Sequence, residues 1–186
     1  MSAFLLVKGG GMETEQRIIE LFDSACIKQF ESLGCDIARV ETQGHSDGFL
    51  RAYIEAVSDN VSVMLCLNVP RRLLVETMPF DGAGEDDSLL VDWVLELSNR
   101  FLGRLKNKLV DHGCSLKMGL PEFCIDTSVQ LSLKEKFTQA DRYFEINNKI
   151  MECCLFLDVS SAAGQLSEYE DEDEDWFAES ELENLS

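Results

Sequence analysis

The stretch VDWVLELSNRFLG, from Val91 to Gly103, carries the repeat from which we predict the fold. It lies in a longer run, Ser88–Asp111, which Gly113 stops. At 100° per residue, the apolar side chains of this run fall within an arc of about 80°, and they are Leu90, Val94, Leu97, Phe101 and Leu105. The run therefore predicts a long amphipathic helix with one face on a core, where we also expect Trp93.

The opposite face of this helix carries a polar stripe. Residues three and four positions apart are neighbours on a helix, so Asp92, Glu96, Asn99 and Gly103 form one straight line. Polar residues are ordinary on an exposed helix face, and the stripe alone is weak evidence of a site. An interior Gly, however, costs a helix about 1 kcal/mol relative to Ala. Gly103 leaves bare backbone beside the polar side chains, where another molecule could approach closely.

The rest of the chain predicts a second long helix and several strands. The second helix runs over 13–32 and ends at Gly34, and an extended segment over 35–43 follows. The runs 49–57 and 61–69 flank Ser-Asp-Asn as a β-hairpin, and a short helix starts at Pro70. Further strands are expected at 115–125, 129–135, 142–146 and 149–159. The predicted class is α+β, with two long helices packed on an antiparallel sheet.

The two long helices also suggest an internal duplication. Both end in Gly-Cys, at Gly34-Cys35 and at Gly113-Cys114, which is an offset of 79 residues. Each is followed by an extended segment and later by a similar apolar strand. We therefore expect an α-β-β pseudo-repeat around a shared sheet.

Length and charge predict one domain with two flanking segments. The 186 residues are enough for one substantial core, which we place at 12–164 after a flexible leader at 1–11. The net charge is −19, and the segment 165–186 holds ten acidic residues and no Lys or Arg, which leaves the body at −9. We predict that this acidic tail is disordered, with Trp176 as its partner-contacting aromatic residue. Such a balance argues against nucleic acid or an anionic membrane surface as a partner.

Cysteine usage predicts a reducing environment. The seven Cys residues include no Cys-x-x-Cys pair, and several lie in apolar runs. We interpret them as reduced and structural rather than as disulfides or zinc ligands, and no metal site is expected. No run approaches the roughly 20 apolar residues of a membrane span, so a soluble cytoplasmic protein is predicted. The two His residues, His45 and His112, lie near loop ends, and His112 suits a helix C-terminus.

The segment DWVLELSNRFLG resembles the signature helix of the CheX/CheC/FliY family of chemotaxis phosphatases. The family pattern is an Asp or Ser, a Glu four residues later and an Asn three residues after that, and Asp92, Glu96 and Asn99 match it in order. Leu102-Gly103 and the later Pro121 also fit the pattern. The element order agrees with the family from residue 13 to about residue 159. The resemblance implies a CheC-like fold.

The same resemblance implies an activity and a partner. Members of the family remove the phosphate from the aspartyl phosphate of a CheY-like response regulator. The 79-residue offset places Arg17 and Glu20 where the second helix has Glu96 and Asn99, so one site is expected. Single-site members are CheX-like, and this likeness implies a homodimer.

The resemblance assigns roles to the stripe. Asn99 would orient the attacking water, because a carboxamide both accepts and donates hydrogen bonds. Glu96 would pair with the active-site lysine of the regulator and fix the docking position. Asp92 is expected near the partner, and Gly103 would allow its approach. Mg²⁺ would belong to the regulator, and no cofactor is expected on this chain.

Two other functions stay open at this point. One is a non-catalytic adaptor or switch-complex module with the same fold, for which the acidic tail would be the interaction arm. The other is a metal-dependent hydrolase using Asp92 and Glu96, which lacks a His or a third acid nearby.

Overall fold

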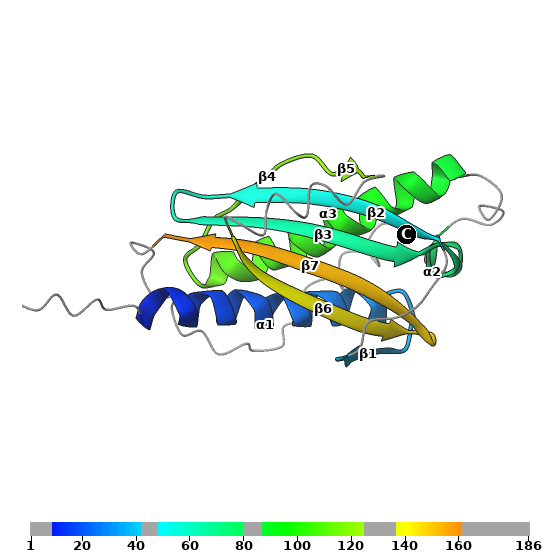
Figure 1. The fold of residues 1–186 in the computed structure, drawn as a ribbon, viewed down its shortest axis with the longest axis horizontal. Coiled ribbons are helices and arrows are strands. Elements are labelled where there is room, and N and C mark those ends of the chain that lie inside the picture. Colours follow the sequence, from blue (N-terminus) through cyan, green and yellow to red (C-terminus); the bar gives the residue numbers. More distant parts are fainter. Residues whose placement is uncertain (1–8, 42–47, 80–86, 125–136, 161–186) are drawn as a thin grey trace, which may run out of the picture.

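Seven strands in one antiparallel sheet and three helices make up the part of the chain that the computed structural model describes, residues 9–41, 48–79, 87–124 and 137–160 (Figure 1). The sheet order is β1-β6-β7-β3-β2-β4, and β5 pairs with β2. The helices are α1 (Gly9–Glu31), α2 (Arg71–Thr77) and α3 (Asp87–Asp111). The strands are β1 (Ile37–Val40), β2 (Phe49–Val57), β3 (Val61–Pro70), β4 (Lys117–Met118), β5 (Glu122–Phe123), β6 (Thr138–Ile146) and β7 (Lys149–Val159).

Two hairpins form the middle of the sheet. Ser58 to Asn60 join β2 to β3, and the Ser58 hydroxyl accepts a hydrogen bond of 3.0 Å from the Val61 backbone N–H. Asn147 and Asn148 join β6 to β7, with φ values of 48° and 59°. Positive φ at both central residues is the type I′ geometry that matches the twist of paired strands. The hairpins meet at β3 and β7, where Val61 pairs with Val159 and Asn68 with Glu152.

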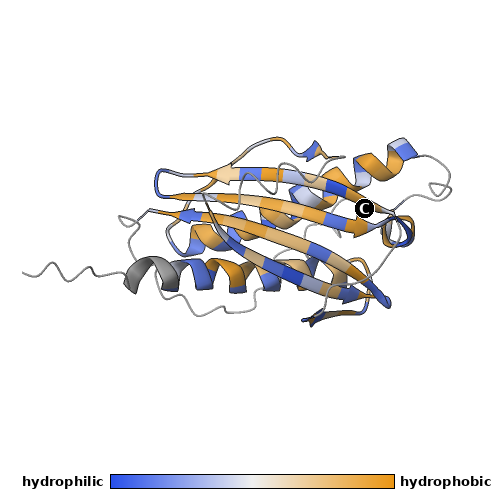
Figure 2. Cartoon of the chain, in the orientation of Figure 1, coloured by the Kyte–Doolittle hydropathy of each residue, from blue (hydrophilic) through white to orange (hydrophobic). Residues whose placement is uncertain are grey.

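The central strands alternate between a core face and an outer face. On β3, Val61, Val63, Leu65, Leu67 and Val69 are buried in the main core, as are Met151, Cys153, Leu155 and Leu157 of β7. Cys66, Cys154 and Phe156 form a second buried cluster, because the intervening residues point to the other face. Figure 2 shows these two strands as predominantly apolar.

The long helices cover the core face of the sheet. Each supplies an apolar stripe to the main core, and the Phe30 and Phe101 rings meet with centroids 5.5 Å apart. Trp93 is 5% exposed, and Phe101 and Leu97 are fully buried. The core-facing arc predicted for α3 is therefore confirmed, including Trp93 and Phe101 as core residues.

A buried ion pair ties α1 to the sheet. The Arg142 Nε atom on β6 lies 3.1 Å from Oδ1 of Asp23 on α1, and Arg39 Nη1 on β1 lies 3.0 Å from the other carboxylate oxygen. Burial raises the pKa of the Asp23 carboxyl, and the two arginines lower it by a smaller amount. This cluster fixes α1 against the edge of the sheet to which β1 and β6 belong.

The observed elements differ from the prediction in a few places. Helix α1 begins at Gly9, so residues 9–11 of the expected leader are helical; a helix held by tertiary packing can extend through poor helix formers. The strand expected at 115–125 is two short strands, β4 and β5, with Gly119 and Pro121 between them. Strand β6 starts at Thr138, four residues before the predicted start. The strand expected at 129–135 and the acidic tail lie outside the described residues.

None of the described helices is both long enough and apolar enough to span a membrane.

Candidate functional site

The N-terminal half of α3 extends beyond the end of α1. The last residues of α1 contact the second half of α3, because Arg104 Nε donates a 2.7 Å hydrogen bond to Gln29 and the Phe30 ring meets Phe101. The two helices run in opposite directions, so α1 ends beside the middle of α3 (Figure 1). Among the described elements, therefore, no second long helix covers the polar stripe that begins at Asp92.

The stripe faces solvent as the sequence predicts. Asp92 and Asn99 are exposed, and the Glu96 side chain is 44% exposed. Within the described residues, no hydrogen bond or ion pair engages the side chain of Asp92 or Asn99. The Asn99 carboxamide is therefore available to an approaching molecule.

Glu96 has an intramolecular partner that the sequence analysis did not consider. The Arg100 Nε atom donates a 2.7 Å hydrogen bond to Glu96 Oε1, and the Arg100 guanidinium lies over the Trp93 ring, 5.2 Å from its centroid. The Trp93 indole is itself fixed, because its Nε1–H donates a 3.1 Å hydrogen bond to the buried Thr77 hydroxyl. The sequence did contain a signal for these two contacts. Arg100 lies four residues after Glu96 and seven after Trp93, and both spacings bring side chains together on one face of a helix.

Gly103, at the end of the stripe, lies beside Met118 of β4. A Cβ atom added there would meet only Met118 Sδ, at 4.0 Å, which is ordinary contact. Beyond Met118, Leu120 is 85% exposed and Phe123 is 39% exposed. The segment holding β4 and β5 therefore presents apolar surface next to this part of α3.

A mostly apolar cavity opens on the other side of the stripe. Its volume is about 310 Å³, and it lies between the end of α2 and the first half of α3. Its lining consists of Met78, Pro79, Leu89, Asp92, Trp93, Glu96 and Arg100. Two residues of the predicted site, Asp92 and Glu96, thus belong to the wall of a cavity.

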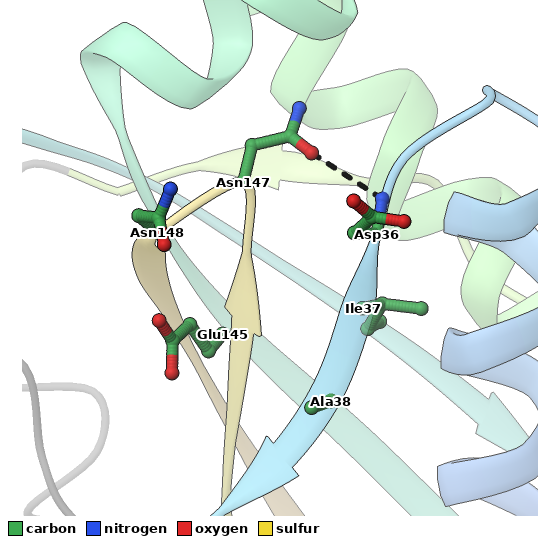
Figure 3. Close-up of a pocket in the computed structure, with 6 residues that line it drawn as sticks. All are labelled: Asp36, Ile37, Ala38, Glu145, Asn147 and Asn148. Carbon is green, nitrogen blue, oxygen red and sulfur yellow. Dashed lines mark hydrogen bonds between the residues drawn. The ribbon is translucent and has the colours of Figure 1, made fainter.

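A second cavity lies far from the stripe, at the β6–β7 turn. It has a volume of about 210 Å³ and is lined by Asp36, Ile37, Ala38, Glu145, Asn147 and Asn148 (Figure 3). The Asn147 side chain is turned toward β1 and accepts a 3.3 Å hydrogen bond from the Asp36 backbone N–H. This contact fixes the turn that joins two strands, which is a structural role.

Other residues that drew attention in the sequence lie apart from the stripe. His112 is buried at the end of α3, and His45 and Trp176 lie outside the described residues. Four of the seven Cys residues are buried, namely Cys26, Cys66, Cys153 and Cys154. In the described part of the chain, no group of three or more His, Cys, Asp and Glu side chains is placed to hold a metal ion.

Comparison with known proteins gives a match in structure. The sequence matches no protein-family profile, and no curated protein matches it in sequence. The chemotaxis protein CheX of Vibrio vulnificus aligns with a TM-score of 0.60 and 12% identity, over 76% of this chain and 96% of that chain. A chain of the CheX–CheY–BeF3–Mg²⁺ complex of Borrelia burgdorferi aligns with a TM-score of 0.58 and 15% identity, over 76% and 97%.

A third structural match is to a chain from a complex that contains neither CheX nor CheY. A chain of the FliM–SpeE complex of Helicobacter pylori aligns with a TM-score of 0.55 and 8% identity, over 82% of this chain and 90% of that chain. At these identities the matches establish the fold. The protein has the CheC-like α+β fold, and the resemblance predicted from the signature helix is confirmed at that level.

Proposed function

We propose that this protein is a phosphatase that hydrolyses the aspartyl phosphate of a CheY-like response regulator. The observation that carries the proposal is the solvent-facing Asn99, one helical turn after Glu96, on a fold shared with CheX. A CheX of this fold has been crystallised together with CheY, BeF3 and Mg²⁺.

The chemistry suits a carboxamide rather than a strong base. An acyl phosphate is already activated, so the catalyst has only to hold a water in line with the bond from phosphorus to the leaving oxygen. The water oxygen forms the new bond to phosphorus while the aspartate carboxylate of the regulator departs, and inorganic phosphate takes up the water protons. Asn99 has a free carbonyl oxygen and amide to orient that water, and Mg²⁺ remains on the regulator.

Glu96 would be the docking residue. Because Glu96 already forms an ion pair with Arg100, docking would replace this ion pair by one with the regulator. The partner's lysine replaces a guanidinium that is already 2.7 Å from the carboxylate. Both members of the existing pair are more than 40% exposed, so this pair is worth at most about 1 kcal/mol. Asp92 and Gly103 would complete the contact surface, as an exposed carboxylate and as a position without a side chain.

The charge pattern of α3 removes an apparent obstacle. An acidic body gains no long-range attraction toward an acidic regulator. The second half of α3, however, carries Arg104, Lys106 and Lys108 in the turns that follow Asn99. This cationic half of α3 gives the site a favourable local field toward an acidic partner.

Three further properties belong to the same proposal. We infer a homodimer and a cytoplasmic location from the likeness to CheX. We also infer that the chain arose by duplication, because the strand order β1-β6-β7-β3-β2-β4 is unchanged when the halves are exchanged. The exchange maps β1 to β4, β2 to β6 and β3 to β7.

Timing of phosphate release tests the proposal. Candidate CheY-like regulators are phosphorylated with a small-molecule phosphodonor, and inorganic phosphate is measured with and without this protein. We expect faster release with wild-type protein and a loss of at least about 100-fold in the maximal rate with Asn99→Ala. Full activity of Asn99→Ala on a regulator that the wild-type protein dephosphorylates would refute the role of Asn99.

One finding favours a second candidate, a non-catalytic adaptor. The FliM–SpeE match shows that the same fold occurs in a complex other than one with CheY. In this case the acidic segment 165–186 would be the interaction arm. Deleting that segment should leave a phosphatase active on purified regulator, whereas an adaptor would lose its partner.

A further inference from the structure

We infer that the cavity beside Glu96 receives an apolar side chain of the docked response regulator, as a second anchor next to the Glu96 contact. This inference rests on the proposed function and adds a specificity-determining pocket to it. The cavity has a volume of about 310 Å³, which is at the lower end of the range for small-molecule sites and fits one inserted side chain.

The location of the cavity links it to the proposed interface. Asp92 and Glu96 belong both to the polar stripe and to the cavity lining. A protein that places its active site over Glu96 and Asn99 therefore also covers the mouth of the cavity. The proposed contact at Glu96 therefore identifies the occupant of the cavity as part of the same docked regulator.

The chemistry of the cavity matches an apolar anchor with a cation nearby. Met78, Pro79, Leu89 and Trp93 supply the apolar surface, and Leu89 is 40% exposed. At the rim, Glu96 is neutralised by Arg100, whereas Asp92 has no ion pair within the described residues. The rim thus carries one net negative charge, which favours a partner segment in which a lysine lies close to an apolar residue.

The cavity is also preformed. Trp93 is held by its hydrogen bond to Thr77, whose hydroxyl in turn donates a 2.8 Å bond to the Leu73 carbonyl. The Met78 N–H bonds to the Leu74 carbonyl at 3.0 Å and closes α2 at the cavity wall. Rigid apolar pockets surrounded by polar groups are where interfaces concentrate their binding energy, because filling them needs little reordering.

Leu89→Glu tests the inference, with Val110→Glu as the matched control. Both positions are exposed apolar residues of α3, at 40% and 50%, but Val110 lies eleven residues beyond Asn99, about 16 Å along the helix. Glutamate is favourable in the first turn of a helix, so Leu89→Glu should fold normally. We expect about a tenfold higher KM for phosphorylated regulator with unchanged kcat, and no change for Val110→Glu.

Trp93 fluorescence gives a readout that does not depend on turnover. In a Trp176→Phe background, Trp93 is the remaining tryptophan, and binding of the beryllofluoride-loaded regulator should shift its emission intensity, because a side chain in the cavity would contact the indole. The shift should persist in Asn99→Ala and weaken in Leu89→Glu. Equal KM values for Leu89→Glu and Val110→Glu, or a shift caused by raising this protein's own concentration without regulator, would overturn the inference. Failure of wild-type protein to release phosphate from any regulator would instead refute the proposed function.

Discussion

Helices α1 and α3 pack on the same face of the sheet but carry different outer side chains. At the 79-residue offset, Arg17 and Glu20 of α1 correspond to Glu96 and Asn99 of α3. On α1 these residues bind each other, with Arg17 Nη1 3.8 Å from Glu20 Oε2, and Gln16 donates a further hydrogen bond to Glu20. On α3 the Asn99 carboxamide has no such partner among the residues that the structure describes. The residues that this offset aligns thus form an ion pair with each other on α1, whereas α3 carries an exposed polar side chain, Asn99, at the aligned position.

The inner faces of the two helices also differ. Asp23 of α1 is held by Arg142 and Arg39, whereas its counterpart on α3 at the same offset is the fully buried Leu102. Helix α1 is attached to the sheet partly by charge, and α3 by apolar packing. This difference supports the proposal that α3 presents the site while α1 has a structural role, and each prediction below tests one side of the comparison.

The largest expected effect is on the structural helix. Asp23→Ala removes a buried carboxylate and leaves Arg142 without its partner, which should lower the free energy of unfolding by about 3–5 kcal/mol. Chemical denaturation followed by circular dichroism measures this loss. The exposed pair on the same helix is the control, because Glu20→Ala should cost less than about 1 kcal/mol. Similar losses for the two variants would contradict the structural role assigned to Asp23.

The next effect concerns binding at α3, the helix proposed to carry the site. Glu96→Ala should weaken regulator binding by about tenfold and also slow turnover, because the variant loses a charged contact that sets the docking position. Titration with beryllofluoride-loaded regulator measures the affinity. Glu20→Ala, on the opposite helix, should bind as wild type does. An unchanged affinity for Glu96→Ala would remove its docking role.

A smaller effect, in the opposite direction, is expected from Arg100. Arg100→Ala frees the Glu96 carboxylate, so regulator binding should become about two- to fivefold tighter, in keeping with the modest energy of an exposed ion pair. The same titration measures it, together with kcat. Weaker binding would show that Arg100 positions Glu96 instead of competing with the partner.

The smallest effect is spectroscopic and concerns the strand edge beside α3. The Tyr53 hydroxyl on β2 donates a short hydrogen bond to Glu122 on β5, and this bond raises the pKa of Tyr53 to about 12. The folded protein therefore keeps this proton at pH values where the unfolded chain loses it. The stabilisation is complete below about pH 10 and is lost as the pH rises toward 12. Tyr53→Phe should remove a late tyrosinate transition near pH 12 from the ultraviolet absorbance titration.

Much of the fold could be predicted because the apolar residues of its long helices and strands recur at regular intervals. The apolar face of α3 repeats every 3.6 residues and the predicted hairpin at 49–57 and 61–69 every two residues, and the structure confirms both. The short strands β4 and β5 were merged in the prediction, since a segment interrupted by Gly119 and Pro121 has no regular period. Register and strand order depend on contacts between distant residues, such as Asn68 with Glu152, which no local pattern contains.

Some features of the candidate site could likewise be predicted from the sequence, and others could not. The sequence placed Asp92, Glu96 and Asn99 on one line, because helical spacing alone determines which side chains share a face. It did not reveal the cavity, whose wall combines Met78 and Pro79 with α3. It also did not reveal that Arg100 forms an ion pair with Glu96, although a spacing of four residues on a helix allows such a pair.

By itself, then, the sequence determined the long amphipathic helix, its polar line and the family resemblance, since each follows from residue order along one element. The tertiary structure decided that α1 ends beside the middle of α3, that α1 leaves the polar face of the first half of α3 exposed in the described part of the chain, and that α2 closes a cavity against α3. The physical reason is that exposure depends on which distant segments pack together, and only the folded chain brings those segments into contact.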